Sequence, residues 1–244
     1  MKKLSLCVGF CALALIFSGC SEKMDPNDPA SVRKYITNQK IAFTPNQFIS
    51  YVLAEDTAKV SLFLQATFEI DSPDANGNNA VAIVVNKGKL NMLEYLVNHG
   101  AKIDLANSKG ETPLDDAIAM GHKDIVKFLV AKMQEKGVIE KASSSVNLAA
   151  KLGNLEIIQI LGDAGAPLEI RGADTYYPIH LAVKGGHYDV VNYLISKNVD
   201  LNVTCGQGYS VLDWAKNEGY TRIITLLKKH GARNTTAYTK EFGH

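Results

Sequence analysis

His180 is the side chain in this 244-residue chain that most invites a catalytic interpretation. It lies near Asp174, Tyr176 and Tyr177, so a general base with polar neighbours can be imagined there. A base also needs a nucleophile or a substrate proton within reach. The sequence contains neither a Gly-x-Ser-x-Gly elbow nor a phosphate-binding Gly-Lys-Ser/Thr loop. We therefore expect His180 to be structural.

The remaining candidates for chemistry recur at fixed offsets, as parts of a scaffold do. Four histidines occupy two such offsets: His122 and His187, and His99 and His230. None of them has the spacing of a zinc-binding helix. The pair Asp115 and Asp116 suggests a metal, but adjacent residues of a helix point apart, which favours capping and solvation. The sequence predicts no catalytic residues, no metal site and no cofactor.

The recurrence follows a period of about 33 residues that predicts how these side chains are positioned. One glycine returns with the same apolar surroundings at Gly88, Gly121, Gly153, Gly186 and Gly219. A second glycine, after the second helix of a unit, recurs at Gly100, Gly165 and Gly231. This period indicates a solenoid of stacked units, each with two short helices, with the second glycine in the left-handed helix-ending conformation.

Two apolar rows recur with the same period and are predicted to form the core. The first is a row of small residues at Val84, Ala117, Ala149, Ala182 and Ala215. The second is a row of leucines at Leu96, Leu129, Leu161, Leu194 and Leu227. One unit cannot bury its apolar face alone, so a charge in either row is expected to break the stack locally.

Two segments carry a family resemblance: Thr112-Pro113-Leu114-Asp115 and Tyr177-Pro178-Ile179-His180, each followed by Gly-His. Other units end in Gly-Ala, at residues 100–101, 165–166 and 231–232. They resemble the ankyrin repeat over about residues 71–233. The resemblance implies an all-α fold, an ankyrin-repeat solenoid of helix-turn-helix units joined by β-turn or hairpin loops. It further implies that His180 hydrogen-bonds within its own repeat. Asp115 and Asp213 fill the same position, where a carboxylate caps a helix.

Three parts of the repeat region depart from the family pattern. Residues 44–71 form a degenerate first repeat, with Glu55 at the glycine position. The connection 132–137 is enlarged and is expected to bulge from the stack. Repeat four has Ser144-Ser145-Val146-Asn147 in place of the Thr-Pro-Leu-His motif.

The N-terminus has a basic start at Lys2 and Lys3, an apolar run of residues 4–17 and then Ser18-Gly19-Cys20. This order describes a secretory signal peptide over residues 1–19. The last three residues resemble the bacterial lipobox, in which the cysteine is lipidated, although Phe17 stands where the family usually has leucine. An ordinary cleaved signal and an uncleaved anchor are the alternatives. The run is too short for a membrane-spanning helix.

The remaining boundaries follow from composition. Residues 20–30, with the lipidated Cys20, are predicted to be a tether, and residues 31–71 an N-terminal cap helix, capped by Ser31, plus the degenerate repeat. Residues 72–233 hold repeats two to six, and 234–244 form a C-terminal tail expected to fray. Cys205, the one cysteine outside the signal besides Cys20, is expected to be a packing residue.

The family resemblance also implies a partner-binding surface. Partners of ankyrin-repeat proteins usually lie on the concave side, made by the loop tips and the exposed part of the first helices. Carried onto this sequence, that side contains Asn76, Asn78, Lys87, Lys109, Glu111, Met120, Lys141, Lys151, Leu152, Asp174, Tyr176, Tyr177, Lys184, Gln207, Tyr209 and Glu218. The exposed tyrosines are candidate anchors for a partner, and packing between loop tips is the alternative.

These features predict a non-enzymatic, monomeric protein-binding lipoprotein. We expect it on the periplasmic side of the outer membrane, since Ser21 resembles the residue that follows the lipidated cysteine in lipoproteins sorted to the outer membrane. A near-zero net charge without a basic run argues against nucleic-acid binding. By analogy, the protein is an immunity protein that blocks a periplasm-acting toxin or lipase effector. A periplasmic scaffold or chaperone for an envelope enzyme, such as one of oxidative-stress defence, stays open, as does an enzyme with an unrecognised site.

Overall fold

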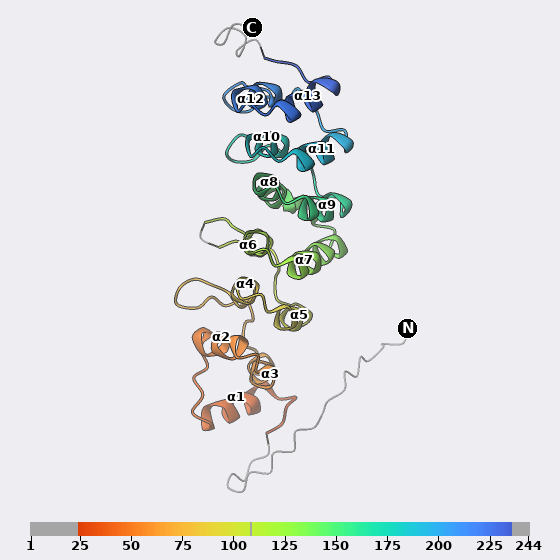
Figure 1. Cartoon of the computed structure of the whole chain (residues 1–244). Helices are drawn as coiled ribbons and strands as arrows, with labels where there is room; N and C mark the ends of the chain where they lie inside the picture. The colour runs from red at the N-terminus through yellow and green to blue at the C-terminus, as the bar shows by residue number, and fades with distance from the viewer. Residues whose placement is uncertain (1–23, 108, 236–244) are drawn as a thin grey trace, which may run out of the picture.

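The computed structural model describes residues 24–107 and 109–235, and these residues form helices in two parallel rows (Figure 1). The described residues contain no β-strand. The first row holds the first helix of each unit: α2 (Pro45–Leu53), α4 (Ala80–Asn86), α6 (Pro113–Met120), α8 (Ser143–Leu152), α10 (Pro178–Lys184) and α12 (Val211–Asn217). The second row holds α3 (Thr57–Gln65), α5 (Leu90–Asn98), α7 (Lys123–Glu135), α9 (Leu155–Asp163), α11 (Tyr188–Ser196) and α13 (Thr221–Lys229). This arrangement is the predicted all-α solenoid.

The N-terminal helix α1 (Pro29–Asn38) packs against α3 and covers the first end of the stack. It begins earlier than the sequence suggested, because Asp28, not Ser31, is its N-cap. The Asp28 carboxylate accepts hydrogen bonds from the backbone N–H groups of Ala30 and Ser31, both at 3.1 Å. Proline at the first helical position suits such a start, since its missing N–H would have no partner there.

The recurring glycines have the backbone conformation that the period predicted. Gly121 and Gly153 each end a first helix with φ of +73° and +70°, and the left-handed region is accessible to glycine at little cost. Gly100, Gly165 and Gly231 also have positive φ after the second helices. In the degenerate repeat Glu55 adopts φ +55° at the same turn, so the turn persists without its glycine.

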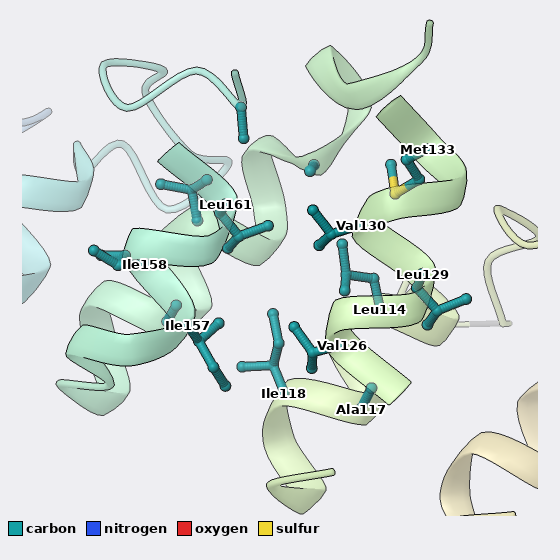
Figure 2. Packing of buried hydrophobic residues seen from close by; sticks show 14 of the residues in the cluster. Leu114, Ala117, Ile118, Val126, Leu129, Val130, Met133, Ile157, Ile158 and Leu161 are labelled. Atoms are coloured by element: carbon teal, nitrogen blue, oxygen red, sulfur yellow. The ribbon is translucent and has the colours of Figure 1, made fainter. Parts of the chain in front are cut away.

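The core lies between the two rows, as the apolar pattern predicted. Every member of the small-residue row and of the leucine row is fully buried. Figure 2 shows apolar side chains of α6, α7 and α9 pointing toward one another, with Ile118, Val126 and Ile157 among them. In the degenerate repeat an aromatic cluster fills the core instead, with Phe48 stacked on Phe68 at a ring-centroid distance of 4.8 Å.

The enlarged connection after repeat three was expected to bulge from the stack, and this expectation is wrong. Residues 132–135 instead continue α7, and the Met133 side chain is buried in the core. Gly137, with φ +66°, ends this extension, and a short 3-10 helix, η1 (Ile139–Ala142), leads directly into α8. Repeat four therefore has no projecting loop (Figure 1).

Repeats two, three, five and six keep a projecting loop before the first helix (Figure 1). Each loop closes with a backbone turn, for example Asp74 N–H to Asn78 O at 2.8 Å and Cys205 N–H to Tyr209 O at 3.0 Å. One isolated antiparallel bridge joins Thr204 to Ser210 in the last loop. Among the helices of residues 24–107 and 109–235, none has the length and apolar character needed to cross a membrane.

Candidate partner-binding face

The predicted partner-binding residues lie on the first-helix row and on the loops that project from it, which together we call the inner face (Figure 1). Of the predicted set, the residues other than the three tyrosines are exposed. The tyrosines Tyr176, Tyr177 and Tyr209 are half-buried. Cys20 lies outside the described residues. The inner face is therefore available to a partner over five consecutive units, although its repeats differ in chemistry.

The loop tips of repeats two and three are rigid turns built on one side chain each. In repeat two, the Asp74 carboxylate accepts from the backbone N–H groups of Asn76 and Asn78 at 2.9 and 2.8 Å. In repeat three, the Asn107 side-chain oxygen accepts from Lys109 N–H and Glu111 N–H, and Asn107 Nδ2 donates to Glu111 Oε2 at 2.9 Å. The Glu111 carboxylate is thus already partnered within its own loop, whereas the side chains of Asn76 and Asn78 are exposed for contact.

The middle of the inner face carries two exposed apolar side chains. Met120 and Leu152 are 57% and 51% exposed and occupy the same position, just before the turn glycine, in repeats three and four. The same position is Lys87 in repeat two and Glu218 in repeat six. Large apolar side chains this exposed on neighbouring units are a mark of contact surfaces. The row therefore changes from basic through apolar to acidic along the stack.

Lys141 is less available than the sequence suggested. Its Nζ forms an ion pair with Asp104 at 3.0 Å, and this contact holds the pKa of Asp104 below its ordinary value. Both residues line a cavity of about 140 Å³, together with Thr112, Met133 and Ser145. The cavity lies where repeat four lacks a loop, beside the junction of repeats three and four.

An aromatic cluster that we call the tyrosine–tryptophan patch covers repeats five and six. It consists of Tyr176, Tyr209 and Trp214, with ring-centroid distances to Trp214 of 5.9 Å from Tyr176 and 6.1 Å from Tyr209. The Tyr176 hydroxyl also donates to Gln207 Oε1 at 3.1 Å. Lys184 places its Nζ 4.9 Å from the Tyr176 ring and 4.8 Å from the Trp214 ring. The tyrosines thus pack between the loops and still expose part of each ring.

Trp214 was missed by sequence reasoning, although it is the one tryptophan of the chain. It occupies the helix position that Leu148 and Leu181 occupy in the two preceding repeats, which is the signal that was available. Its half-buried ring links the two tyrosines predicted as anchors. Trp214 Nε1 is buried and has no hydrogen-bond acceptor within the described part of the chain.

His180 is structural, as expected, but the expectation that it bonds within its own repeat is wrong. Its Nε2 lies 3.2 Å from Tyr209 O in the following repeat. A carbonyl oxygen only accepts, so Nε2 carries the hydrogen and Nδ1 is left as an acceptor. Nδ1 is buried without a donor in the described residues. Tyr177, which replaces the capping threonine, offers no side-chain cap.

Burial is the main reason that the pKa of His180 is lowered to about 4, and the positive charge of Arg171 lowers it further. The hydrogen bond to Tyr209 O acts in the opposite direction and is outweighed. His180 is fully buried. A neutral imidazole that no substrate can reach is a connector between repeats and not a general base.

Asp115 and Asp213 cap their helices as predicted, and each also bonds to residues that come later in the stack. Asp115 accepts from Thr112 N–H and Thr112 Oγ1 and from the buried Ser145 hydroxyl at 2.5 Å. Asp213 accepts from Asn234 Nδ2 at 2.8 Å and from Thr235 N–H at 3.1 Å. The start of the C-terminal tail therefore does not fray at Asn234, because residues 234 and 235 occupy the place of a following repeat.

The chemistry that the described residues can perform is binding. In the part of the chain that the structure describes, no three His, Cys, Asp or Glu side chains are grouped so that they could hold a metal ion. Cys205 is a buried free thiol at the base of the last loop, which is the predicted packing role. His187 Nε2 lies 3.0 Å from Lys151 O, so this histidine also ties one repeat to the next.

The paired helices, turn glycines and projecting loops define the class of ankyrin-repeat solenoids. A family model described as "Ankyrin repeats (3 copies)" matches residues 49–139 and 146–237. The chain belongs to the ankyrin repeat family. The fold of this family generally serves as a binding module without catalysis, and the chain is accordingly a protein-binding scaffold in its architecture.

Solved structures agree with this fold. The chain is similar to an ankyrin repeat domain from Acinetobacter baumannii AYE, with a TM-score of 0.68 and 19% identity over 76% of this chain and 98% of that one. A second ankyrin repeat protein of known structure gives a TM-score of 0.65 and 23% identity, covering 77% of this chain and 99% of that chain. At these identities the likeness shows the fold alone.

Curated relatives share the repeats and are much longer. The chain is 28% identical over 168 residues to the phosphocholine transferase AnkX of Legionella pneumophila, covering 66% of this chain and 17% of that protein. It is 29% identical over 129 residues to the ankyrin repeat and SAM domain-containing protein 6 of Danio rerio, covering 52% and 18%. The chain therefore spans less than a fifth of the length of these two relatives.

Proposed function

We propose that this chain is a non-enzymatic, protein-binding lipoprotein of the bacterial envelope, and specifically an immunity protein. In this role it binds a secreted antibacterial effector in the periplasm and blocks it by covering its surface. The observation that carries the proposal is the inner face, which holds exposed apolar side chains such as Leu152 and the partly exposed tyrosine–tryptophan patch. Exposed aromatic and apolar side chains on a rigid scaffold supply binding energy at low entropic cost.

The envelope location rests on the N-terminal sequence. Lys2, Lys3 and the apolar run before Ser18-Gly19-Cys20 support export and lipidation at Cys20. Two or more acyl chains anchor a protein stably to a membrane. The nine residues from Cys20 to Asp28 span at most about 30 Å when extended, so the repeats would work close to the membrane surface. A tethered inner face would then meet effectors that act on lipid or cell wall.

The experiment uses the full chain with a C-terminal affinity tag, expressed in its native host and captured from the detergent-solubilised envelope. We expect one protein partner in stoichiometric amount, and protection of cells from that partner when it is expressed in the periplasm. A Tyr176→Ala/Tyr209→Ala variant should weaken the complex without unfolding the repeats. Recovery of a redox enzyme without toxicity would instead favour the scaffold or chaperone role.

The location is tested separately with a Cys20→Ala variant. Metabolic labelling with an alkyne fatty acid should mark the wild-type chain and not the variant, and the variant should leave the membrane fraction. An unlabelled wild-type chain would refute lipidation while leaving the binding role intact.

A further inference from the structure

The inner face of repeats four and five carries two lysines whose charges no carboxylate neutralises in the described residues. Lys151 and Lys184 occupy the same helix position in consecutive repeats, two residues before the turn glycine. Several other lysines of the stack are paired with carboxylates, for example Lys89 with Glu55 at 2.5 Å, Lys123 with Glu156, and Lys197 with Asp163 at 3.1 Å. We call Lys151 and Lys184 the lysine pair. Their positive charges can therefore form ion pairs with a bound anion.

The scaffold holds the backbone of Lys151 and the side chain of Lys184. His187 Nε2 contacts the backbone oxygen of Lys151 at 3.0 Å, which ties the end of α8 to repeat five. The Lys184 ammonium lies against two rings, at 4.9 Å from Tyr176 and 4.8 Å from Trp214. A cation between aromatic faces is stabilised without being neutralised. Less ordering entropy is then lost when an anion binds.

The lysine pair has an apolar neighbour on the surface. Leu152 protrudes beside Lys151 with 51% of its surface exposed, and the same position in the next repeat is Gly185, which has no side chain. An apolar contact is therefore available next to Lys151.

The charge changes beyond this region. Position-matched residues of repeat six are Asn217 in place of the lysines and Glu218 in place of Leu152. In repeat three, Asp116 is half-buried near Glu111, and its pKa is raised by burial and by that carboxylate. Carboxylates in repeats three and six would repel an anionic ligand. The part of the inner face that favours such a ligand is therefore limited to repeats four and five.

We propose that the lysine pair binds an acidic segment of a protein partner, two carboxylates of which contact Lys151 and Lys184 while an apolar side chain rests on Leu152. This inference rests on the proposed binding function and names the chemistry of its partner. Helices packed side by side lie 8–10 Å apart, and α8 packs directly against α10. In an extended segment the side chains i, i+2 and i+4 point to one face, so two carboxylates about 13 Å apart flank an apolar side chain, and the long lysine side chains reach across the remaining difference.

The probe is a synthetic peptide with the core Glu-Ser-Leu-Ser-Glu between Gly-Ser flanks, and its matched control has Gln-Ser-Leu-Ser-Gln. Neither peptide contains tryptophan, so the fluorescence of Trp214 in the purified full chain reports binding at the patch. Two exposed ion pairs favour the glutamate peptide by about fivefold at low salt. The preference should shrink in 0.5 M salt, because exposed charges are screened.

Three variants make the test specific. Lys151→Ala and Lys184→Ala should each reduce the glutamate preference by about twofold, and the double variant should abolish it. Lys184→Arg should retain the preference, since it keeps the charge and can stack on the rings. Lys127→Ala, on the outer surface of α7, is the matched control and should change nothing.

Equal binding of the two peptides, or an unchanged preference in the double variant, would overturn the inference. So would binding of phosphatidylglycerol vesicles through the same lysines in place of the peptide, because the site would then serve a membrane. If the envelope partner still binds the double variant with unchanged affinity, the inference fails and the proposed function stands. If no envelope partner exists but the glutamate preference depends on the lysine pair, the proposed function fails and the assignment of an acidic ligand to the lysine pair stands.

Discussion

At the junction of repeats three and four, Asp115 receives hydrogen bonds from its own cap and from Ser145 of the next repeat. At the junction of repeats five and six, His180 occupies the same helix position. His180 reaches the next repeat through a single bond to Tyr209 O, and its second nitrogen has no donor in the described residues. One position therefore connects neighbouring units in both places, with different numbers of bonds.

The difference comes from the number of hydrogen bonds that each side chain can accept or donate. A carboxylate has about four lone-pair sites, so Asp115 can cap its helix and also bind the next unit. A neutral imidazole has one donor and one acceptor. At His180 the donor is used by the next unit, and the acceptor is unused because Tyr177 replaced the hydroxyl that Thr112 and Ser210 supply. The second junction should consequently be weaker and sensitive to acid.

The largest effect is expected from Asp115→Ala. The variant leaves the buried Ser145 hydroxyl and the Thr112 N–H without their acceptor, and each polar group left unsatisfied costs about 2 kcal/mol, so the loss should be about 4 kcal/mol. Urea unfolding followed by circular dichroism measures the loss. Asp124→Ala, an exposed carboxylate in the first turn of α7, is the control and should cost about 0.5 kcal/mol. A similar loss in both variants would mean that Asp115 acts only as a helix cap.

The second largest effect is expected in acid, where protonation of His180 should lower the free energy of unfolding. Its pKa is lowered to about 4 in the fold, against 6.5 unfolded, so the unfolded chain binds the proton first as pH falls. The contribution is complete well above pH 6.5 and is lost as the pH falls toward 4, about 2–3 kcal/mol by pH 4.5. The measurement is urea unfolding at pH 7.5 and 4.5 for the wild type and His180→Asn. The variant should lose about 2–3 kcal/mol less than the wild type between the two pH values, and equal losses would refute the assignment.

Much of this architecture was predictable from the sequence, because a glycine in a turn or an alanine between two helices is required by local geometry. The positive φ at Gly121 and the burial of Ala117 come from the repeat itself. The helical conformation of residues 132–135 was not predictable, since an extra helical turn and a bulging loop have similar composition. The junction at His180 was not predictable either, because its partner is a backbone oxygen 29 residues away.

The candidate site was predictable in position but not in contacts. The resemblance to a repeat family indicates which residues face inward, and the exposed Met120 and Leu152 lie there. It does not indicate that Glu111 and Lys141 are engaged in local bonds, nor that Trp214 joins Tyr176 and Tyr209. Such pairings depend on the distance between side chains of different repeats, which no single repeat specifies.

A smaller effect is expected at the end of the stack, where Asp213 extends the comparison to a junction without a following repeat. Asn234 and Thr235 supply the donors that Ser145 supplies to Asp115. The double variant Asn234→Ala/Thr235→Ala removes the side-chain donors and keeps the backbone bond, so it should cost about 1–2 kcal/mol. Hydrogen exchange of α12 and α13 should rise in this variant. Exchange that rises equally in Asn217→Ala would show that the bonds to Asp213 are not responsible.

The smallest effect is expected at Lys141, which lies at the same junction as Asp115 but on its surface. The Lys141–Asp104 pair measures 3.0 Å, and the two side chains are 55% and 36% exposed. Exposed ion pairs contribute little, so Lys141→Ala should cost at most about 0.5 kcal/mol in urea unfolding. Combined with Asp115→Ala, it should add no more than that. A larger cost would mean that the junction is stabilised from the outside as well as through the buried carboxylate, and the contrast with His180 would then rest on surface charge and not on bonding capacity.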